Sequence, residues 1–280
     1  MATGTRPGTT VEEIYQTLRE RIVEGRYMPG FRMSQGALAA DLETSRTPLR
    51  EALHRLEADG LLVAEANRGM QVAPASDEAV EECYAMRLLI EPPTVAAITL
   101  DLSDAELAAM EDALDEMDSK RHRTRDYQEA HLRFHELALS HYPAAFREVV
   151  RSLHMKIYRH QRLYFSRPEV PGDFTHVDRV FLAAIRDRDG GLAKQLLEFH
   201  LIDAAMGMIL DKEPDHTFDS LLTAARGVGI EIEPPSGDQA DRHTTVRWHR
   251  SDARVLPPLA TTTIQYVPES KEAPAREGTG

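Results

Sequence analysis

The sequence contains very little cysteine, since Cys83 is the only one among 280 residues. A single thiol excludes an internal disulfide bond, and such scarcity is typical of the reducing cytoplasm. No apolar run approaches 18 residues, so we expect no membrane span. The first ten residues, MATGTRPGTT, lack the apolar core of an export signal. These absences favour a cytoplasmic protein, and the length of the chain allows two domains.

Positive charge is also scarce, because the formal net charge is −13 at pH 7. An excess of acidic residues argues at first against a nucleic-acid-binding protein. The acidity is unevenly distributed, however. Residues 1–75 hold nine arginines and ten acidic residues, whereas the remainder holds 24 basic and 36 acidic residues. DNA binding by the nearly neutral N-terminal part must therefore depend on a few well-placed arginines, and nonspecific binding should be modest and salt-sensitive.

Residues 33–62 contain two short segments in which apolar residues recur at helical spacing. The residues at this spacing are Ala37, Leu38, Leu42, Leu49, Ala52, Leu53 and Leu56. Residues 43–45 lie between the segments, so the sequence predicts two helices joined by a tight turn. Pro48 fits the first turn of the second helix, where its missing N–H costs nothing.

Arginine and hydroxyl side chains gather at the start of the second of these helices. Arg46 and Arg50 are four residues apart and share one helix face. Ser45 and Thr47 lie beside them, and Thr44 or Ser45 can cap the helix. A helix N-terminus with these groups suits phosphates and guanine edges in a major groove, as in a recognition helix. The alternative is a helical hairpin whose arginines are simply solvated.

A β-hairpin is predicted directly after this helix. Gly60 ends the helix, residues 61–63 have the composition of a strand, and residues 70–72 form the return strand. Residues 67–69, Asn-Arg-Gly, are typical of a tight turn. Arg68 at its tip could contact a phosphate or the minor groove. A helix-turn-helix followed by a hairpin is a winged helix.

The remaining boundaries follow from composition and periodicity. Residues 11–25 carry an apolar stripe at helical spacing that ends at a glycine, so the winged-helix domain is predicted to span residues 10–75. The small polar residues 1–9 are expected to be a disordered arm.

Residues 218–225 could form one or two further helical turns. Trp248 and residues 261–267 could pair as strands, but no apolar face supports them. Because residues 212–280 are rich in Pro, Gly, Thr and Glu, we expect a mostly disordered extension.

Residues 76–211 are predicted to be almost entirely helical. Their apolar stripes and short connections indicate a bundle of six or seven helices. The first helix is expected over residues 78–90, and Pro92 and Pro93 should kink or interrupt it before residue 94. The predicted fold is therefore mainly α, a winged helix of three helices plus a β-hairpin followed by an all-α bundle.

Four histidines of the bundle occur at positions that suit a metal site. His131 and His135 are four residues apart on one helix face, while His176 and His200 lie on two further predicted helices. Imidazoles brought together from three helices can bind a first-row transition metal. Because the chain has 12 histidines, a structural or surface role for these four is the alternative. The His-Glu-x-x-His signature of metalloproteases is absent.

The N-terminal segments LRERIVEGRYMPGFRMS, LAADLETSRTPLREALHRLEADGLL and RGMQV resemble the DNA-binding domain of GntR-type bacterial transcription regulators. The run SRTPLREAL is long and specific to that family. The resemblance implies that Ser45, Arg46, Thr47 and Arg50 contact bases and phosphates, and that Gly69 is the glycine of the wing.

The bundle resembles the all-helical FCD effector domain of the FadR subfamily, over the segments HLRFHELAL and THVDRVFLAAIRDRDGGLAKQLLEFHLIDA. This resemblance implies that His135, His176 and His200 ligate a metal. The fourth ligand of the family is usually an aspartate, and His131 stands at its position here. An imidazole in place of a carboxylate removes one negative charge and favours zinc or nickel over harder metals.

Arg87 is the predicted contact of an effector. It lies in the segment RLLIE, where the family has an arginine and a glutamate that face the ligand. A guanidinium can bind a carboxylate through two hydrogen bonds. The alternative is an ordinary helix salt bridge between Arg87 and Glu91 at i+4.

We therefore expect a ligand-responsive transcription regulator, a repressor. A homodimer should bind a palindromic double-stranded operator, and a small carboxylate effector should bind the metal and Arg87. Two other hypotheses remain. The four histidines could serve a metal-dependent hydrolase, for which Glu136 is the only nearby base, but it points about 100° away from its neighbour His135 on the helix. The bundle could also lack metal and bind a larger apolar acid.

Overall fold

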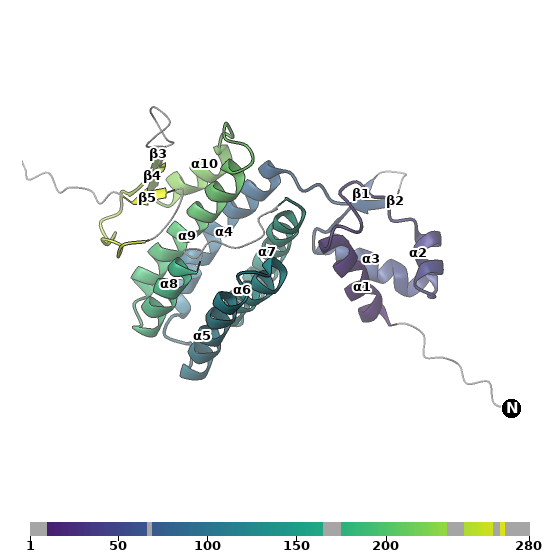
Figure 1. Ribbon diagram of the computed structural model, residues 1–280, viewed down its shortest axis with the longest axis horizontal. Helices are drawn as coiled ribbons and strands as arrows, with labels where there is room; N and C mark the ends of the chain where they lie inside the picture. The colour runs from purple at the N-terminus through teal and green to yellow at the C-terminus, as the bar shows by residue number, and fades with distance from the viewer. Residues whose placement is uncertain (1–9, 66–68, 165–174, 234–243, 260–263, 267–280) are drawn as a thin grey trace, which may run out of the picture.

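The computed structural model describes residues 10–65, 69–164, 175–233, 244–259 and 264–266. It contains a small N-terminal domain and a larger helical domain (Figure 1). The predicted arm and Arg68 lie outside the described residues. The small domain consists of α1 (Val11–Val23), α2 (Gln35–Asp41), α3 (Arg46–Ala58) and a hairpin of β1 (Leu62–Glu65) and β2 (Gly69–Val72).

Local signals define the limits of these elements. Thr10 and Glu13 form a reciprocal capping box at the start of α1, and Ser34 caps α2. Gly60, with φ +73°, lies just beyond α3, in the left-handed conformation that glycine adopts most easily. The three helices and the hairpin bury one apolar core, which includes Ile14, Leu18, Leu49, Leu53 and Val72. The predicted winged helix is confirmed.

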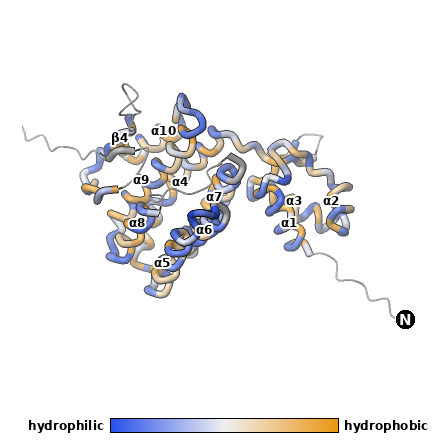
Figure 2. The backbone as a smooth tube through the Cα atoms, viewed as in Figure 1, coloured by the Kyte–Doolittle hydropathy of each residue, from blue (hydrophilic) through white to orange (hydrophobic). Residues whose placement is uncertain are grey.

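The larger domain contains the bundle helices α4 (Asp77–Ile98), α5 (Asp104–Ser119), α6 (Thr124–Leu139), α7 (Ala144–Tyr164), α8 (His176–Arg186) and α9 (Gly190–Leu210). These six helices confirm the predicted bundle. Helix α4 packs along α9 and also contacts α7, while α5 packs on α6 and α8 on α9. Figure 2 shows apolar and polar residues alternating along the helices, as expected when each helix buries one face.

The predicted interruption at Pro92 and Pro93 does not occur, because both prolines lie inside the continuous helix α4. A proline inside a helix removes a backbone N–H donor and leaves a carbonyl without its usual partner. The carbonyls concerned are those of Leu88 and Leu89, four residues before the two prolines. Packing of Pro92 in the core, where it is buried, favours the uninterrupted helix.

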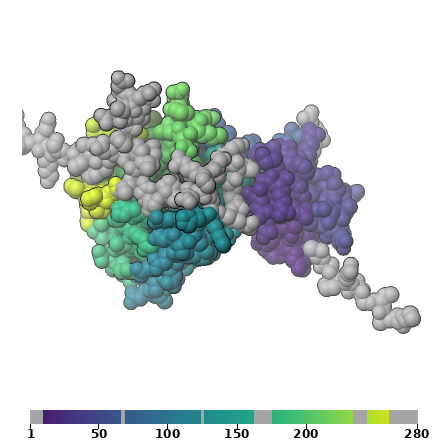
Figure 3. All heavy atoms as spheres, in the orientation of Figure 1, coloured from purple at the N-terminus to yellow at the C-terminus, as the bar shows by residue number. Residues whose placement is uncertain are grey.

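The expectation of a mostly disordered extension is wrong for residues 228–233 and 244–259, whereas the helical turns expected at residues 218–225 are present. This region forms α10 (Asp219–Gly227), β3 (Ile230–Glu233) and β4 (Thr244–Trp248), and β5 (Ile264–Tyr266) adds a third strand. Strand β4 lies in the middle, antiparallel to β3 and parallel to β5. Apolar residues of α10, β3 and β4 belong to the same core as the bundle helices. Figures 1 and 3 show this region at the end of the helical domain that lies away from the winged helix.

No helix within the described ranges combines the length and apolar character needed to cross a lipid bilayer.

Candidate metal centre and DNA-binding surface

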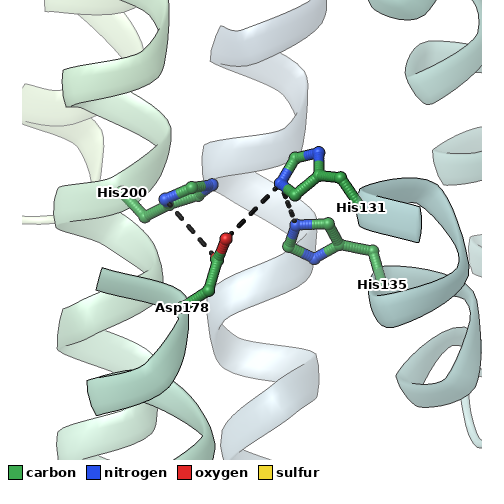
Figure 4. Close-up of side chains that lie close together, drawn as sticks. All are labelled: His131, His135, Asp178 and His200. Atoms are coloured by element: carbon green, nitrogen blue, oxygen red, sulfur yellow. Dashed lines mark hydrogen bonds and ion pairs between the residues drawn. The ribbon is translucent and has the colours of Figure 1, made fainter. Parts of the chain in front are cut away.

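Four side chains from three helices converge inside the helical domain. His131 and His135 extend from α6, Asp178 from α8 and His200 from α9 (Figure 4). One ligand atom from each lies within 4.8 Å of the others. The Nε2 atoms of His131 and His135 are 3.0 Å apart. The carboxylate of Asp178 lies 3.6 Å from His131 Nε2 and 3.7 Å from His200 Nδ1.

The structure corrects one member of the predicted ligand set, because Asp178 takes the place expected of His176. The two residues lie about 200° apart on α8, since an α-helix turns once in 3.6 residues. Asp178 shares the buried face of α8 with Val177 and Phe181, whereas His176 is partly exposed. Its Nε2 lies 3.2 Å from the carbonyl of Pro258. His131, His135 and His200 are brought together as expected.

The surroundings of the cluster disfavour charge on every member. Burial raises the pKa of Asp178 to about 8 and lowers the pKa of His200 to about 4. Burial also lowers the pKa of His131 and of His135 well below the usual range, and neighbouring imidazoles add to this shift. Neutral imidazoles are the form that binds a metal, and a bound cation would displace the proton of Asp178.

The donor set fits a divalent transition metal. Asp178 is 1% exposed, and its Oδ2 atom is buried without a hydrogen-bond partner. Because an unpartnered carboxylate oxygen is costly to bury, its position beside three imidazoles suits that of a metal ligand. From the sequence, His131 in place of the usual aspartate was expected to leave the site with one negative charge fewer. Asp178 supplies that charge. Three nitrogen ligands and one carboxylate suit borderline metals.

Arg87 lies close to this cluster on α4. It is buried and pairs with Glu91, with a second hydrogen bond of 3.3 Å from Nη2 to Oε2. The helix salt bridge expected as the alternative is therefore present. His154 of α7 also contacts Glu91, at 3.2 Å, and its ring centroid is 5.8 Å from that of His135. Burial has the largest effect on the pKa of Asp178 and raises it. The positive charge of Arg87 has a smaller effect and lowers this pKa.

The predicted DNA-binding side chains lie on one exposed surface of the small domain. Ser45 is the N-cap residue of α3 without a side-chain capping bond. Arg46, Thr47 and Arg50 are exposed on the first turns of α3. Neither arginine forms a salt bridge with another described residue. Gly69, with φ +85°, opens β2 next to the turn of the wing. These hydroxyl and guanidinium groups are free to contact DNA.

The structure gives no support to Glu136 as a catalytic base. Its carboxylate lies 3.7 Å from the guanidinium of Arg151 on α7, and both side chains are largely exposed. Glu136 is partly exposed, whereas its neighbour His135 is buried.

Comparison with protein families decides what kind of protein carries these features. The family model described as "Bacterial regulatory proteins, gntR family" matches residues 10–72, and that of the FCD domain matches residues 82–203. The HTH-type transcriptional regulator BphR of Paraburkholderia xenovorans is 30% identical over 205 residues, which span 68% of this chain and 82% of that relative. The chain belongs to the gntR family of bacterial regulatory proteins. This GntR-family protein is therefore a DNA-binding transcription regulator.

Two further relatives, one curated protein and one solved structure, are matched over most of their own length. The galactonate operon transcriptional repressor of Escherichia coli is 28% identical over 210 residues, which span 66% of this GntR-family chain and 90% of that protein. A solved structure of a GntR transcriptional regulator from Rhodococcus sp. RHA1 has a TM-score of 0.60 and 26% identity, and covers 71% of this chain and 97% of that one. With two other curated regulators, the match spans only 57% and 46% of their length.

Proposed function

We propose that this regulator is a repressor of the FadR subfamily that binds a palindromic operator as a homodimer and responds to a small organic acid. The acid binds at a zinc or nickel ion held by His131, His135, Asp178 and His200, and Arg87 contacts its carboxylate. The acid controls the spacing of the two winged helices of the dimer. It can do so only if it binds one arrangement more tightly than the other.

The observation that carries the proposal is the convergence of three imidazoles on a buried carboxylate with an unpartnered oxygen. When bound, the metal would act as a Lewis acid for a carboxylate oxygen at a coordination position that the protein leaves open. The charge of Arg87 acts on all four members of the cluster, and Glu91 is its present partner. A ligand carboxylate can replace Glu91 as that partner with similar bidentate geometry.

Helix α7 supplies a physical connection between this centre and the DNA-binding domain. His154 of α7 contacts Glu91 beside the cluster. Two residues earlier on the same helix, the Ser152 hydroxyl donates a hydrogen bond of 3.1 Å to the carbonyl of Asp59, just after the recognition helix. Arg159, also on α7 and buried, donates to the carbonyl of Ala73 in the linker between the domains. A shift of α7 on ligand binding would therefore move the winged helix.

The charge distribution supports a dimeric mode of DNA binding. The winged-helix region is close to neutral, so one copy has little nonspecific attraction for DNA. Two linked copies on a palindrome gain affinity because the second contact is intramolecular. The relative named as a galactonate operon repressor supports both a repressor and a sugar acid or similar hydroxy acid as the effector.

The experiment is an operator titration followed by fluorescence anisotropy. The labelled duplex carries the promoter region of the regulator's own operon. The acid is identified beforehand by a thermal-shift screen of organic acids, with and without a chelator. We expect nanomolar to micromolar binding that the acid changes at least fivefold when zinc is present. Chelation, or Asp178→Asn, should abolish the response to the acid and preserve operator binding.

Glu136→Gln is the matched control, because Glu136 lies on α6 with two of the proposed ligands but pairs outward with Arg151. It should respond to the acid like the wild type. A protein that binds the operator identically with and without acid, metal or Asp178 would refute the effector half of the proposal. Absence of specific operator binding would refute the DNA-binding half.

A further inference from the structure

The segment of residues 244–259 lies against α8 and α9, the helices that carry the proposed metal ligands Asp178 and His200. This segment, here called the clamp, contains β4 and the chain that follows it. The match to the FCD model ends at residue 203, so the clamp lies outside both family matches. Within the clamp, Val246, Trp248 and Leu256 are buried in the core of the helical domain.

The strongest contact of the clamp is with Glu198 on α9. The Glu198 side chain is fully buried and accepts a hydrogen bond of 3.0 Å from Trp248 Nε1. The Arg250 guanidinium donates to both Glu198 carboxylate oxygens, at 2.6 and 2.9 Å. The ring of Trp248 also stacks on Phe199, with centroids 6.4 Å apart. His200, a proposed metal ligand, is the next residue of α9.

A second contact fixes the beginning of α9. The Gln195 side chain donates 2.8 Å to the carbonyl of Arg254 and accepts 2.8 Å from its backbone N–H, so both ends of the amide are satisfied by one clamp residue. The Arg254 guanidinium pairs with Asp189, which caps α9 at its N-terminus. Rotation or sliding of α9 would break these contacts together.

Helix α8 is contacted in the same way. His176 Nε2 lies 3.2 Å from the carbonyl of Pro258, and Asp178 follows two residues later. Glu198 likewise precedes His200 by two residues. In both helices, the clamp therefore contacts the residue two positions before the proposed ligand. His176 thus has a role other than the metal ligation that the sequence suggested.

We propose that the clamp is a positioning element that holds α8 and α9 in the rotation at which Asp178 and His200 converge, so that metal affinity depends on it. This inference rests on the proposed metal centre. Ligand affinity depends on groups that orient the ligands as well as on the ligands themselves, and loss of such groups typically weakens metal binding about 10- to 100-fold. Because the clamp acts through the helix backbone and does not touch the ligand side chains, we expect a loss of metal affinity near the lower end of this range, about tenfold.

The test uses the full chain with Glu198→Gln and Arg250→Gln combined. The pair is removed as a unit because either change alone would deprive a largely buried charge of its closest partner. Arg247→Gln is the matched control, since Arg247 lies on β4 but pairs with Glu233 away from the bundle. Zinc affinity is measured by competition with a chromophoric chelator well below the unfolding temperature of the metal-free protein. The absorption spectrum of the Co²⁺-loaded protein reports the coordination geometry.

We expect the double variant to weaken zinc binding about tenfold and to alter the Co²⁺ spectrum, while Arg247→Gln stays within twofold of the wild type. A double variant that unfolds at a lower temperature but keeps its zinc affinity and Co²⁺ spectrum would show a merely structural role and overturn the proposal. If the double variant does not fold, Trp248→Phe replaces it, because it removes one donor and keeps the ring. A loss below twofold in that variant also overturns the proposal. Wild-type protein that binds no zinc would instead refute the metal centre itself.

Discussion

Removal of the Arg50 guanidinium should weaken operator binding strongly without affecting the fold. Arg50 is exposed on α3 and forms no ion pair with another described residue. Truncation to alanine therefore removes no intramolecular contact, and we expect the free energy of unfolding to change by no more than about 0.5 kcal/mol. Any large effect on DNA binding must then come from the DNA interface.

The size of that effect follows from the contact that α3 can make. An arginine that reads a guanine edge contributes about 1–3 kcal/mol. A dimer on a palindrome loses the contact in both half-sites, so the total is about 2–6 kcal/mol, or roughly 30-fold to 20,000-fold in Kd. Operator and scrambled duplexes are compared by anisotropy. The scrambled duplex should lose far less affinity than the operator, because base contacts and not phosphate contacts are removed.

Arg55→Ala is the control for this measurement. Arg55 lies on the same helix, but its guanidinium is held 2.7 Å from Glu12 and 4.2 Å from the ring centroid of Tyr15. It therefore faces α1 and not the DNA-binding surface, and operator affinity should stay within about threefold of wild type, since rim contacts of this kind contribute little. Equal losses for Arg50→Ala and Arg55→Ala, or an unchanged Kd for Arg50→Ala, would refute the assignment of α3 as the recognition helix.

Two further predictions concern stability. Phe134→Ala should lower the free energy of unfolding by about 3–5 kcal/mol, because Phe134 is fully buried, whereas Phe146→Ala, on an exposed part of α7, should change it little in chemical denaturation. Burial alone would lower the pKa of His216, but its hydrogen bonds and charge interactions with Glu81 and Glu213 together outweigh burial and raise that pKa. These interactions should therefore stabilise the fold fully below about pH 6.5 and progressively less as pH rises through the folded-state pKa. The unfolding temperature of wild type should thus fall more between pH 6 and 8 than that of His216→Gln, and parallel curves would contradict this.

The winged helix could be predicted from sequence because its signals are local. Pro48 fits the first turn of α3, Gly60 follows its C-terminus, and apolar residues recur at helical spacing between them. His131 and His135 likewise share a face through their spacing of four, whatever the tertiary fold.

Prediction of the fourth member of the cluster, Asp178, required information that the spacing of histidines does not contain. Which residue of α8 faces the cluster depends on the rotation of that helix in the bundle. One signal was available, because Asp178 falls within the apolar stripe of Val177, Phe181 and Ile185. An acidic residue on a buried stripe indicates a paired or metal-bound carboxylate, whereas His176 lies outside the stripe.

The folded extension escaped prediction because its strands are short and their partners are distant in sequence. Strand β3 alternates buried and exposed residues over only four positions, and β4 over five. Its buried polar contacts are made with Glu198, about 50 residues earlier. Period-two patterns of this length do not distinguish a strand from a loop without knowledge of the surface on which they pack.

The most direct test of the metal centre is a zinc titration of the metal-free wild type, Asp178→Asn and His176→Ala, with stoichiometry determined by calorimetry. Wild type and His176→Ala should each bind about one zinc ion per chain at saturation, and Asp178→Asn should show no binding at micromolar zinc, because only the aspartate belongs to the cluster. Loss of zinc in His176→Ala with retention in Asp178→Asn would contradict the ligand set.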